Sequence, residues 1–430
     1  MRFPNKKKLL DCRHKSEQDD EVILPSSAYI HIPFCRRRCY YCDFPISVLG
    51  DKVSGSTSGS IEQYIEVLCQ EIKATPPLSS SLNTIFFGGG TPSLLTVRQL
   101  GRIVETLEDH FGIAHQAEIS LEMDPGTFGL EQLKGYRETG VNRVSLGVQA
   151  FQDELLSLCG RSHNHTDILA AVELLYQVEI PDFSLDLMSG LPNQTIEQWQ
   201  TSLSSAIDIR PTHISCYDLI VEPVTAFGRL YSPGRKPLPR EEATAKMYRL
   251  GQEVLSSAGY EHYEISNYAL PGHHCRHNRV YWENLPYYGF GMGAASYIEG
   301  QRFTRPRTRR EYFTWVQQLI DANGALDCPK TSKADTLLET LMLGLRLADG
   351  LNLFSLKERF GEAALKQIFI SLKPYYNKGW VEIVNVTSEA IEFLETDLLP
   401  LDSRLRLTDP EGFLFSNQVL ADLFNQLPEE

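Results

Sequence analysis

The sequence from Tyr29 to Phe44 reads YIHIPFCRRRCYYCDF, and it indicates both the architecture and the chemistry of this chain. Its three cysteines, Cys35, Cys39 and Cys42, are spaced C-x3-C-x2-C directly after an apolar run typical of a strand. Thiolates bind soft metals and iron–sulfur clusters. A [4Fe–4S] cluster has four irons, so three cysteine ligands leave one iron open to another ligand. The spacing therefore favours a reactive iron–sulfur centre.

Zinc is the main alternative for these cysteines. A structural zinc site is closed by four ligands, commonly arranged as two C-x2-C-like pairs. Only one such pair occurs here, and no second pair follows at the spacing of a zinc ribbon. Free thiols are the remaining alternative, and the spacing favours an iron–sulfur cluster over both.

Composition excludes several other classes of protein. The net charge of −14 argues against general nucleic-acid binding, which needs a basic face. We expect no transmembrane segment, because no apolar run is long enough to span a bilayer. We also expect no signal peptide, because no apolar segment follows the basic start of the chain. The nine cysteines are odd in number and mostly scattered, which favours a reducing compartment, the cytoplasm. Residues 1–24 are expected to be a flexible tail, with a chloroplast or mitochondrial transit remnant as the alternative.

Short apolar runs alternate with helical patterns from about Ser27 to Pro223. The predicted strands are Tyr29–Ile32, Thr84–Phe87, Glu118–Glu122, Arg143–Val148, Phe183–Met188 and His213–Leu219. Thr96 with Gln99, and Thr195 with Gln198, are capping boxes that predict helix starts. Six strand–helix units predict a parallel sheet, as either an open partial barrel or a doubly wound sheet.

Polar and glycine residues follow these predicted strands at their carboxyl ends. Gly88 to Pro92 follow the second strand, and Glu122, Gln149 and Asp186 end or nearly end later ones. Ligands of parallel sheets gather at this edge. Each residue alone is more often a turn, a salt bridge or a structural hydrogen bond. Arg161 could bind a carboxylate through two parallel hydrogen bonds. Together with the cysteines and Arg161, these residues predict a polar ligand site.

The pattern changes towards the end of the chain. A helix is predicted at Ala334–Leu347, then strands at Trp380–Val386, Ala390–Leu394 and Leu405–Phe415, and a last helix at Asn417–Phe424. Helices followed by a hairpin suggest a small winged-helix-like α+β domain. We therefore expect a tail at 1–24, a core with an extension at 25–300 and a C-terminal domain at 301–430.

The motifs resemble the family of the oxygen-independent coproporphyrinogen III oxidase and its relative, the HemW-type heme chaperone, within the radical S-adenosylmethionine (SAM) superfamily. The resemblance extends over nearly the whole chain beyond the tail and implies a partial (β/α)6 barrel. It implies that Cys35, Cys39 and Cys42 hold a [4Fe–4S] cluster whose open iron binds SAM. The SAM site implied by the resemblance consists of Tyr29, Tyr41, Gly89, Gly90, Thr91, Glu122, Gln149, Arg161 and Asp186.

The two branches of this family differ after the third cysteine. The decarboxylating oxidase has a further cysteine two positions on, where this chain has Phe44, and the chaperone branch has Cys-Asp-Phe as here. Tyr263–Ala269 also resembles the chaperone branch. The resemblance therefore implies a protein that binds heme, delivers it to acceptor hemoproteins and needs an electron donor. Coproporphyrinogen oxidation is the alternative, and whether SAM is cleaved and whether the chain forms a homodimer stay open.

The ligand of such a heme is not determined by the motifs. Residues 273–277, His-His-Cys-Arg-His, are the densest group of candidate axial ligands outside the cysteine loop, and His277 or Cys275 is our choice. A hydrated surface loop is an equal alternative. The arginines between 302 and 310 could meet heme propionates, but a solvated or interdomain face is the favoured interpretation.

Overall fold

The computed structural model describes residues 23–427 except 51–54, 79–80, 326–328, 392–399 and 401. The tail expected at residues 1–24 thus lies almost wholly outside the described residues. The chain divides into two compact units. Unit 1 comprises residues 1–146, 166–181 and 285–331, and unit 2 comprises residues 147–165, 182–284 and 332–430.

Unit 1 is built on a parallel sheet. Its strands, in spatial order, are β11 (Tyr288–Phe290), β1 (Ser27–Ile32), β4 (Leu82–Gly89), β5 (Ile113–Met123) and β6 (Arg143–Gln149), the last of which ends in unit 2. Ile30 lies opposite Phe87, and Phe87 lies opposite Leu121. All three side chains are fully buried, so apolar burial fixes the register of the strands. The four predicted strands of this region are confirmed.

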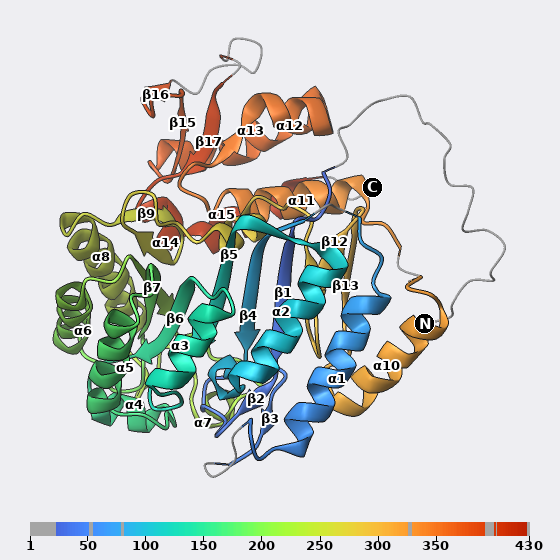
Figure 1. Ribbon diagram of the computed structural model, residues 1–430. Helices are drawn as coiled ribbons and strands as arrows, with labels where there is room; N and C mark the ends of the chain where they lie inside the picture. The colour runs from blue at the N-terminus through green and yellow to red at the C-terminus, as the bar shows by residue number, and fades with distance from the viewer. Residues whose placement is uncertain are drawn as a thin grey trace. The chain divides into compact units, whose positions relative to one another are not determined.

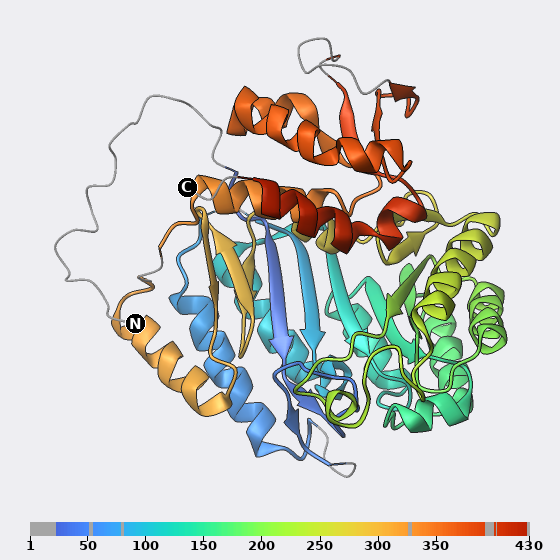
Figure 2. The ribbon, with the colours of Figure 1, turned by 180° about the vertical axis from the view of Figure 1, so that it is seen from behind.

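Helices cover one face of this sheet. Figure 1 shows α2 (Val97–Phe111) in front of β1 and β4, with α1 (Gly59–Ala74) beside α2, and in Figure 2 the same strands lie in front of α2. The capping box of Thr96 and Gln99 is present at the start of α2. Leu100, Ile103 and Leu107 of this helix are buried at the spacing of one helical face. The remaining helices of unit 1 are η1 (Pro92–Leu94), α3 (Leu130–Glu138), α5 (His165–Gln177) and α10 (Arg309–Asp321).

Two short strand pairs complete unit 1. β2 (Phe34–Cys35) pairs with β3 (Ser47–Val48), and β12 (Ala295–Ile298) forms an antiparallel hairpin with β13 (Gln301–Thr304). We predicted no strand between residues 260 and 304. Strands of three or four residues carry too few apolar positions to show an alternating pattern, which explains the omission.

A buried ion pair joins three elements of unit 1. Arg305, after β13, donates from Nε to Glu71 Oε1 of α1 at 2.7 Å, and both side chains are inaccessible to solvent. The other carboxylate oxygen accepts from the Tyr312 hydroxyl of α10 at 2.6 Å and from the Gly291 amide at 2.8 Å. The expectation of a solvated arginine run is therefore wrong for Arg305, because its charge is paired inside the unit. A buried carboxylate that accepts this many bonds fixes the positions of its partners.

Unit 2 begins with a second group of strands. β7 (Asp182–Ser189) pairs in parallel with β8 (His213–Asp218), and β10 (Asn267–Ala269) runs antiparallel between β8 and β9 (Glu261–Glu264). The capping box of Thr195 and Gln198 begins α6, as predicted. The helices of this part are α4 (Asp153–Leu158), α6 (Ile196–Ile209), α7 (Ala226–Leu230), α8 (Glu241–Ser257) and α9 (Arg276–Trp282).

The C-terminal part of unit 2 has its own hydrophobic core, which includes Leu341, Leu372, Leu405 and Leu423. Its helices are α11 (Lys333–Gly344), α12 (Leu353–Phe360), α13 (Glu362–Asn377), α14 (Glu411–Leu414) and α15 (Ser416–Gln426). Its antiparallel sheet has the order β14 (Leu351–Asn352), β17 (Arg404–Leu407), β15 (Val381–Val384) and β16 (Ala390–Ile391). The strand predicted at Leu405–Phe415 is wrong beyond Leu407. Pro410 cannot donate to a strand ladder, and it caps the short helix α14 instead.

The buried pair gives a prediction about stability. Replacing Arg305 by Met should lower the free energy of unfolding by about 3–5 kcal/mol, because Glu71 would keep a buried charge without its cation. The double variant Arg305→Met with Glu71→Gln should lose less than the sum of the two single losses. Denaturant unfolding followed by circular dichroism measures these differences.

The exposed pair of Lys134 and Glu131 in the same unit provides the control. Lys134→Met should change the free energy of unfolding by no more than about 1 kcal/mol. If Arg305→Met unfolds at the same denaturant concentration as the Lys134 variant, the pair does not hold unit 1 together.

Candidate functional site

The cysteine loop is closed by backbone hydrogen bonds at its two ends. The Ser47 amide donates to Pro33 O at 2.6 Å, and the Leu49 amide donates to Cys35 O at 2.9 Å. Inside the loop, the Cys42 amide donates to Cys39 O at 3.2 Å, which makes a tight turn. Cys35 is buried, whereas Cys39 and Cys42 are half-buried. The fold therefore brings all three thiols together in one short loop at the carboxyl end of β1.

The loop offers the thiols of Cys35, Cys39 and Cys42 as ligands for an iron–sulfur cluster. Among the residues that the structure describes, no group of three or more His, Cys, Asp or Glu side chains is placed to hold a single metal ion. In a [4Fe–4S] cluster each thiolate binds a different iron. The described cysteines are also free thiols, which a cluster needs as ligands.

The surroundings of two of the thiols, Cys35 and Cys42, favour the protonated form. Burial raises the pKa of the Cys35 thiol to about 12, although a hydrogen bond with Thr91 opposes this. Burial also raises the pKa of Cys42, against a hydrogen bond with the backbone of Phe44. Metal binding has to displace these protons, since the thiolate is the ligand.

The glycine segment after β4 lies directly against the cysteine strand. The Gly90 amide donates to Ile32 O at 2.8 Å, and the Thr91 amide donates to Phe34 O at 2.7 Å. A Cβ atom on Gly90 would lie 2.7 Å from Phe34 O, which is too close for any side chain. The sequence therefore has glycine here because two backbones touch, and this contact places Thr91 next to Cys35.

Glu122 lies on the neighbouring strand and faces the same segment. Its Oε2 accepts from the Gly89 amide at 2.9 Å. Glu122 also contributes to raising the pKa of Tyr29, after burial, which is the larger cause. Unit 1 therefore brings together six of the predicted site residues around the cysteine loop: Tyr29, Tyr41, Gly89, Gly90, Thr91 and Glu122.

His31 belongs to this site and was missing from our prediction. The Pro45 carbonyl can only accept, so His31 Nε2 donates to it at 3.0 Å and Nδ1 accepts from the Tyr29 hydroxyl at 3.0 Å. Burial lowers the pKa of His31 to about 4, which keeps the ring neutral. The ring fills the space where Gly89 lacks a Cβ, at 2.4 Å from the ideal Cβ position. A histidine inside an apolar strand next to the cysteines was the sequence signal for this role.

The other three predicted site residues lie in unit 2. Gln149 is buried with φ at +62°, and its Oε1 makes no hydrogen bond to any of the described residues. Arg161 donates from Nη2 to Gly147 O at 3.1 Å, and Asp186 accepts from the Ser184 hydroxyl at 3.3 Å. Their approach to the cysteine loop of unit 1 stays a prediction. Burial of an amide oxygen without a hydrogen bond costs free energy. A ligand group that donates a hydrogen bond to Gln149 Oε1 would remove this cost.

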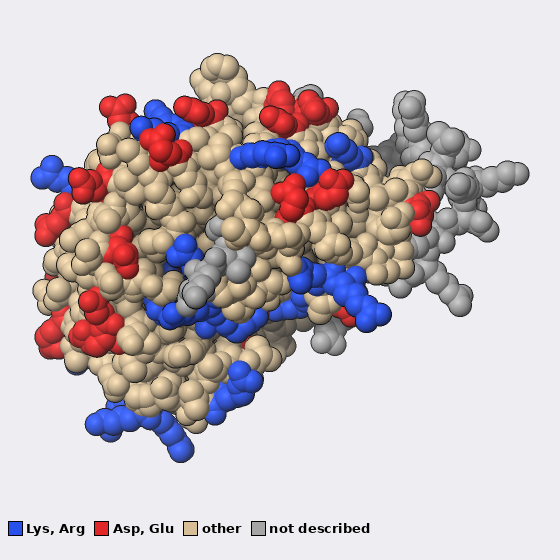
Figure 3. Space-filling view, turned by 60° about the horizontal axis from the view of Figure 1, so that its bottom comes forward, with Lys and Arg blue, Asp and Glu red and all other residues tan. Residues whose placement is uncertain are grey.

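Basic side chains surround the cysteine loop. Arg36 donates to Gly126 O at 3.0 Å, and Arg38 donates to Cys42 O at 3.2 Å. Arg307, which precedes α10, donates to Asp43 O at 2.8 Å. Figure 3 shows that Lys and Arg side chains gather in a band across the face turned to the viewer. These contacts order the loop and at the same time concentrate positive charge on it.

The candidate heme ligands in unit 2 differ in accessibility. His277 and Cys275 are buried, and His277 Nε2 bonds the Tyr281 hydroxyl at 2.8 Å. Burial lowers the pKa of His277 to about 3. His274 is partly exposed, bonds Glu261 Oε2 at 2.9 Å and stacks on Tyr263. The alternative of a hydrated loop is therefore wrong for His277, which belongs to the interior of the unit.

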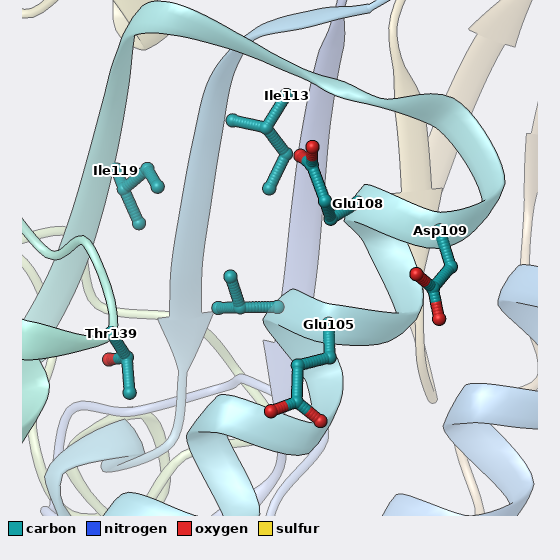
Figure 4. Close-up of a pocket in the computed structure, with 7 residues that line it drawn as sticks. Glu105, Glu108, Asp109, Ile113, Ile119 and Thr139 are labelled. Atoms are coloured by element: carbon teal, nitrogen blue, oxygen red, sulfur yellow. The ribbon is translucent and has the colours of Figure 1, made fainter.

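A hollow of about 520 Å³ lies elsewhere in unit 1 (Figure 4). Ile113 and Ile119 line one side, and Glu105, Glu108 and Asp109 project from α2 on the other. None of the predicted site residues lines this hollow. It is therefore separate from the candidate site around the cysteines.

Comparisons with known proteins identify the relatives of this chain. Residues 29–206 match the family model of the radical SAM superfamily, and residues 331–387 match that of the HemN C-terminal domain. The heme chaperone HemW of Synechocystis sp. is 47% identical over 95% of this chain and 98% of its own length. The heme chaperone HemW of Bacillus subtilis is 36% identical over 83% of this chain and 92% of its own length.

A solved structure resembles the whole chain. The coproporphyrinogen III oxidase HemN of Escherichia coli matches with a TM-score of 0.76 over 94% of this chain and 91% of its own. Its sequence identity is 22%, so this likeness shows the fold alone.

The backbone contact at Gly90 can be tested by adding one methyl group. Gly90→Ala should cost about 1–3 kcal/mol of stability, because Phe34 and the added Cβ must separate. The same shift should move Thr91 away from Cys35 and reduce the iron that the chain retains after anaerobic reconstitution. Iron and sulfide analysis and a thermal melt measure the two effects.

Gly59→Ala is the matched control, because no atom lies within 4 Å of its added Cβ and the residue begins α1. This variant should keep its iron and its melting temperature. Equal iron content in the Gly90 and Gly59 variants would show that the close approach is not required by the site.

Proposed function

The chain belongs to the family of the heme chaperone HemW, within the radical SAM superfamily, and from this premise we propose that it binds heme and delivers it to acceptor hemoproteins. The observation that carries the proposal is the 47% identity to a heme chaperone over 95% of the chain. The α/β fold of the radical SAM superfamily with a C-terminal domain, which we expected from the sequence and its resemblance, is confirmed.

The proposed cofactor of unit 1 is one [4Fe–4S] cluster held by Cys35, Cys39 and Cys42. Three thiols in one closed loop, with no fourth cysteine in the loop, support a cluster that keeps one iron for SAM. When bound and reduced, such a cluster supplies an electron to the sulfonium of SAM. The neutral His31 and the Glu122 carboxylate hold the glycine segment and Tyr29 in place beside the loop.

The proposed SAM site consists of the residues that the family resemblance implies. Gly89, Gly90 and Thr91 present backbone groups at the edge of the cysteine loop, and the Glu122 carboxylate accepts from the Gly89 amide beside them. Gln149, a residue of unit 2, belongs to the proposed set because its buried Oε1 has no partner among the described residues. Tyr41, Arg161 and Asp186 complete the proposed set.

The alternative function is the oxidation of coproporphyrinogen III. The structural likeness to the E. coli oxidase is a likeness of fold at 22% identity. Phe44 occupies the position where the resemblance expects a further cysteine in the oxidase, and its side chain is exposed. The heme chaperone is therefore the better supported function.

The heme ligand is proposed to be His277, with Cys275 as the alternative. Burial keeps the His277 ring neutral, which is the form that binds iron. Coordination requires the bond between His277 and the Tyr281 hydroxyl to open. This requirement predicts that heme binding is accompanied by a local rearrangement of α9.

Two further properties follow from the proposal. The chain needs an electron donor to reduce its cluster, and it acts in the cytoplasm, as a monomer or a homodimer. No helix among the described residues is long and apolar enough to cross a membrane. The alternative of an organelle transit segment concerns residues 1–22, which lie outside the described residues.

Anaerobic reconstitution tests the proposed function on one sample. The chain should take up about four irons, since one cubane binds per chain, and heme titration should give a saturable Soret band. Incubation with coproporphyrinogen III, SAM and reductant should yield no protoporphyrinogen.

Cys39→Ala should lose its iron, whereas Cys69→Ala, a buried cysteine on α1, should keep it. A chain that shows no saturable heme band, or that decarboxylates coproporphyrinogen, would overturn the chaperone proposal.

The heme ligand can be tested with a pair of histidine variants. His277→Ala should remove or shift the Soret band of the heme complex, because it removes the proposed axial nitrogen. His274→Ala should leave the band in place, since His274 bonds Glu261 in a partly exposed position. If only the His274 variant changes the spectrum, the accessible histidine is the ligand and our assignment is wrong.

A further inference from the structure

Tyr263 begins the segment Tyr263–Ala269, which resembles the chaperone branch and lies outside the proposed cluster and SAM residues. Glu264 and His262 of β9 lie opposite consecutive residues of β10, so Tyr263 between them is the extra residue of a β-bulge. Its carbonyl accepts from the Ala348 amide at 3.0 Å. A bulge directs the side chain of its extra residue away from the regular alternation of the strand.

The Tyr263 side chain contacts the residues that precede α9. Its hydroxyl accepts from the Cys275 amide at 3.4 Å and bonds His213 Nε2 of β8 at 2.9 Å. Its ring stacks on the His274 ring, with the two centroids 4.3 Å apart and the planes 14° from parallel. Cys275 is the N-cap residue of α9. Tyr263 therefore holds the point at which α9 begins.

This hold on the start of α9 is buried. Tyr263, Cys275 and His213 are 3%, 3% and 2% exposed. Water cannot replace a hydrogen bond that breaks at such a position, and a buried polar group that loses its partner is costly. The start of α9 is therefore the part of this helix that resists displacement.

The contacts along the rest of α9 are more exposed. Arg279 donates to Glu283 Oε1 and to Asp349 Oδ2, each at 2.8 Å. The Arg279 and Asp349 side chains are 27% and 54% exposed, and ion pairs in contact with water stabilise little. Release of His277 from the Tyr281 hydroxyl should therefore open the end of α9 that follows Arg279 and leave the start in place.

We propose that Tyr263 is a positioning residue for the heme ligand. It fixes the start of α9, so that His277 stays in place for the heme iron while the exposed end of the helix moves. This inference deepens the proposed function and rests on its assignment of His277 to heme. Tyr263 acts through His274 and Cys275 and needs no contact with heme itself.

Tyr263→Phe tests the proposal, because it removes the hydroxyl and keeps a ring that can stack on His274. In the chain without heme, the amides from Cys275 to Arg279 should exchange their hydrogens about fivefold faster or more, since the start of α9 loses a buried bond. The variant should bind heme about fivefold more weakly or worse, with a broadened Soret band. Hydrogen exchange followed by mass spectrometry and heme titration measure these effects.

Tyr248→Phe is the matched control. The Tyr248 hydroxyl of α8 donates to Ile265 O at 3.0 Å, so this variant loses the same atom and a bond to the turn that follows β9. It should keep the heme affinity of the unchanged chain and the exchange rates of the amides of α9. Asp349→Asn removes the exposed partner of Arg279 and should bind heme as fast as the unchanged chain or faster.

A measurement on the unchanged chain needs no substitution and covers the case in which Tyr263→Phe does not fold. Heme binding should speed the hydrogen exchange of the amides from Val280 to Glu283, whereas the Cys275 amide should keep its protection.

Three results would overturn the proposal. They are a Tyr263→Phe chain that matches the Tyr248 control in heme affinity and in exchange, a Cys275 amide that loses protection when heme binds, and slower heme binding by Asp349→Asn. Failure of the proposed function is distinguishable from these results. An unchanged chain that takes up no heme refutes that function and this inference with it, whereas a heme-binding chain that is insensitive to Tyr263→Phe refutes the inference alone.

Discussion

The site depends on the close contact of two backbones at the carboxyl edge of the sheet in unit 1. The amides of Gly90 and Thr91 donate to carbonyls on either side of Pro33, and no Cβ fits between them. This contact holds the glycine segment beside Cys35 and lets the Gly89 amide turn to Glu122. The cysteine loop closes onto β3 from the other side. Backbone hydrogen bonds on both sides therefore fix the ends of the three-cysteine loop.

The helices and strands were largely predictable from the sequence where buried apolar residues recur at a regular spacing. β1, β4, β5 and β6 are buried runs of apolar residues between helices, and both capping boxes are formed as predicted. The strands from β9 to β13 were missed, because strands of three or four residues carry too few apolar positions to show an alternating pattern. The strand predicted beyond Leu407 fails because Pro410 ends the ladder and begins α14.

The candidate site was predictable to a different degree. The C-x3-C-x2-C spacing indicated the cysteines as cluster ligands. The glycines that follow a predicted strand indicated the edge of the sheet at which a ligand binds. The sequence could not indicate that His31 bonds both Tyr29 and Pro45, or that Arg305 leaves the basic run to pair with Glu71. Both depend on residues that are distant in the sequence or on the opposite side of a loop. The sequence predicts the burial of such a polar side chain only when its hydrogen-bond partner is known.

The central claim is that the three thiols hold a [4Fe–4S] cluster with one iron open to SAM. Electron paramagnetic resonance of the anaerobically reconstituted and reduced chain, recorded with and without SAM, tests it most directly. We expect the spectrum of a reduced cubane cluster, with g values that change when SAM is added because the open iron gains ligands. A spectrum that SAM leaves unchanged, or the absence of any cluster signal, would contradict the account.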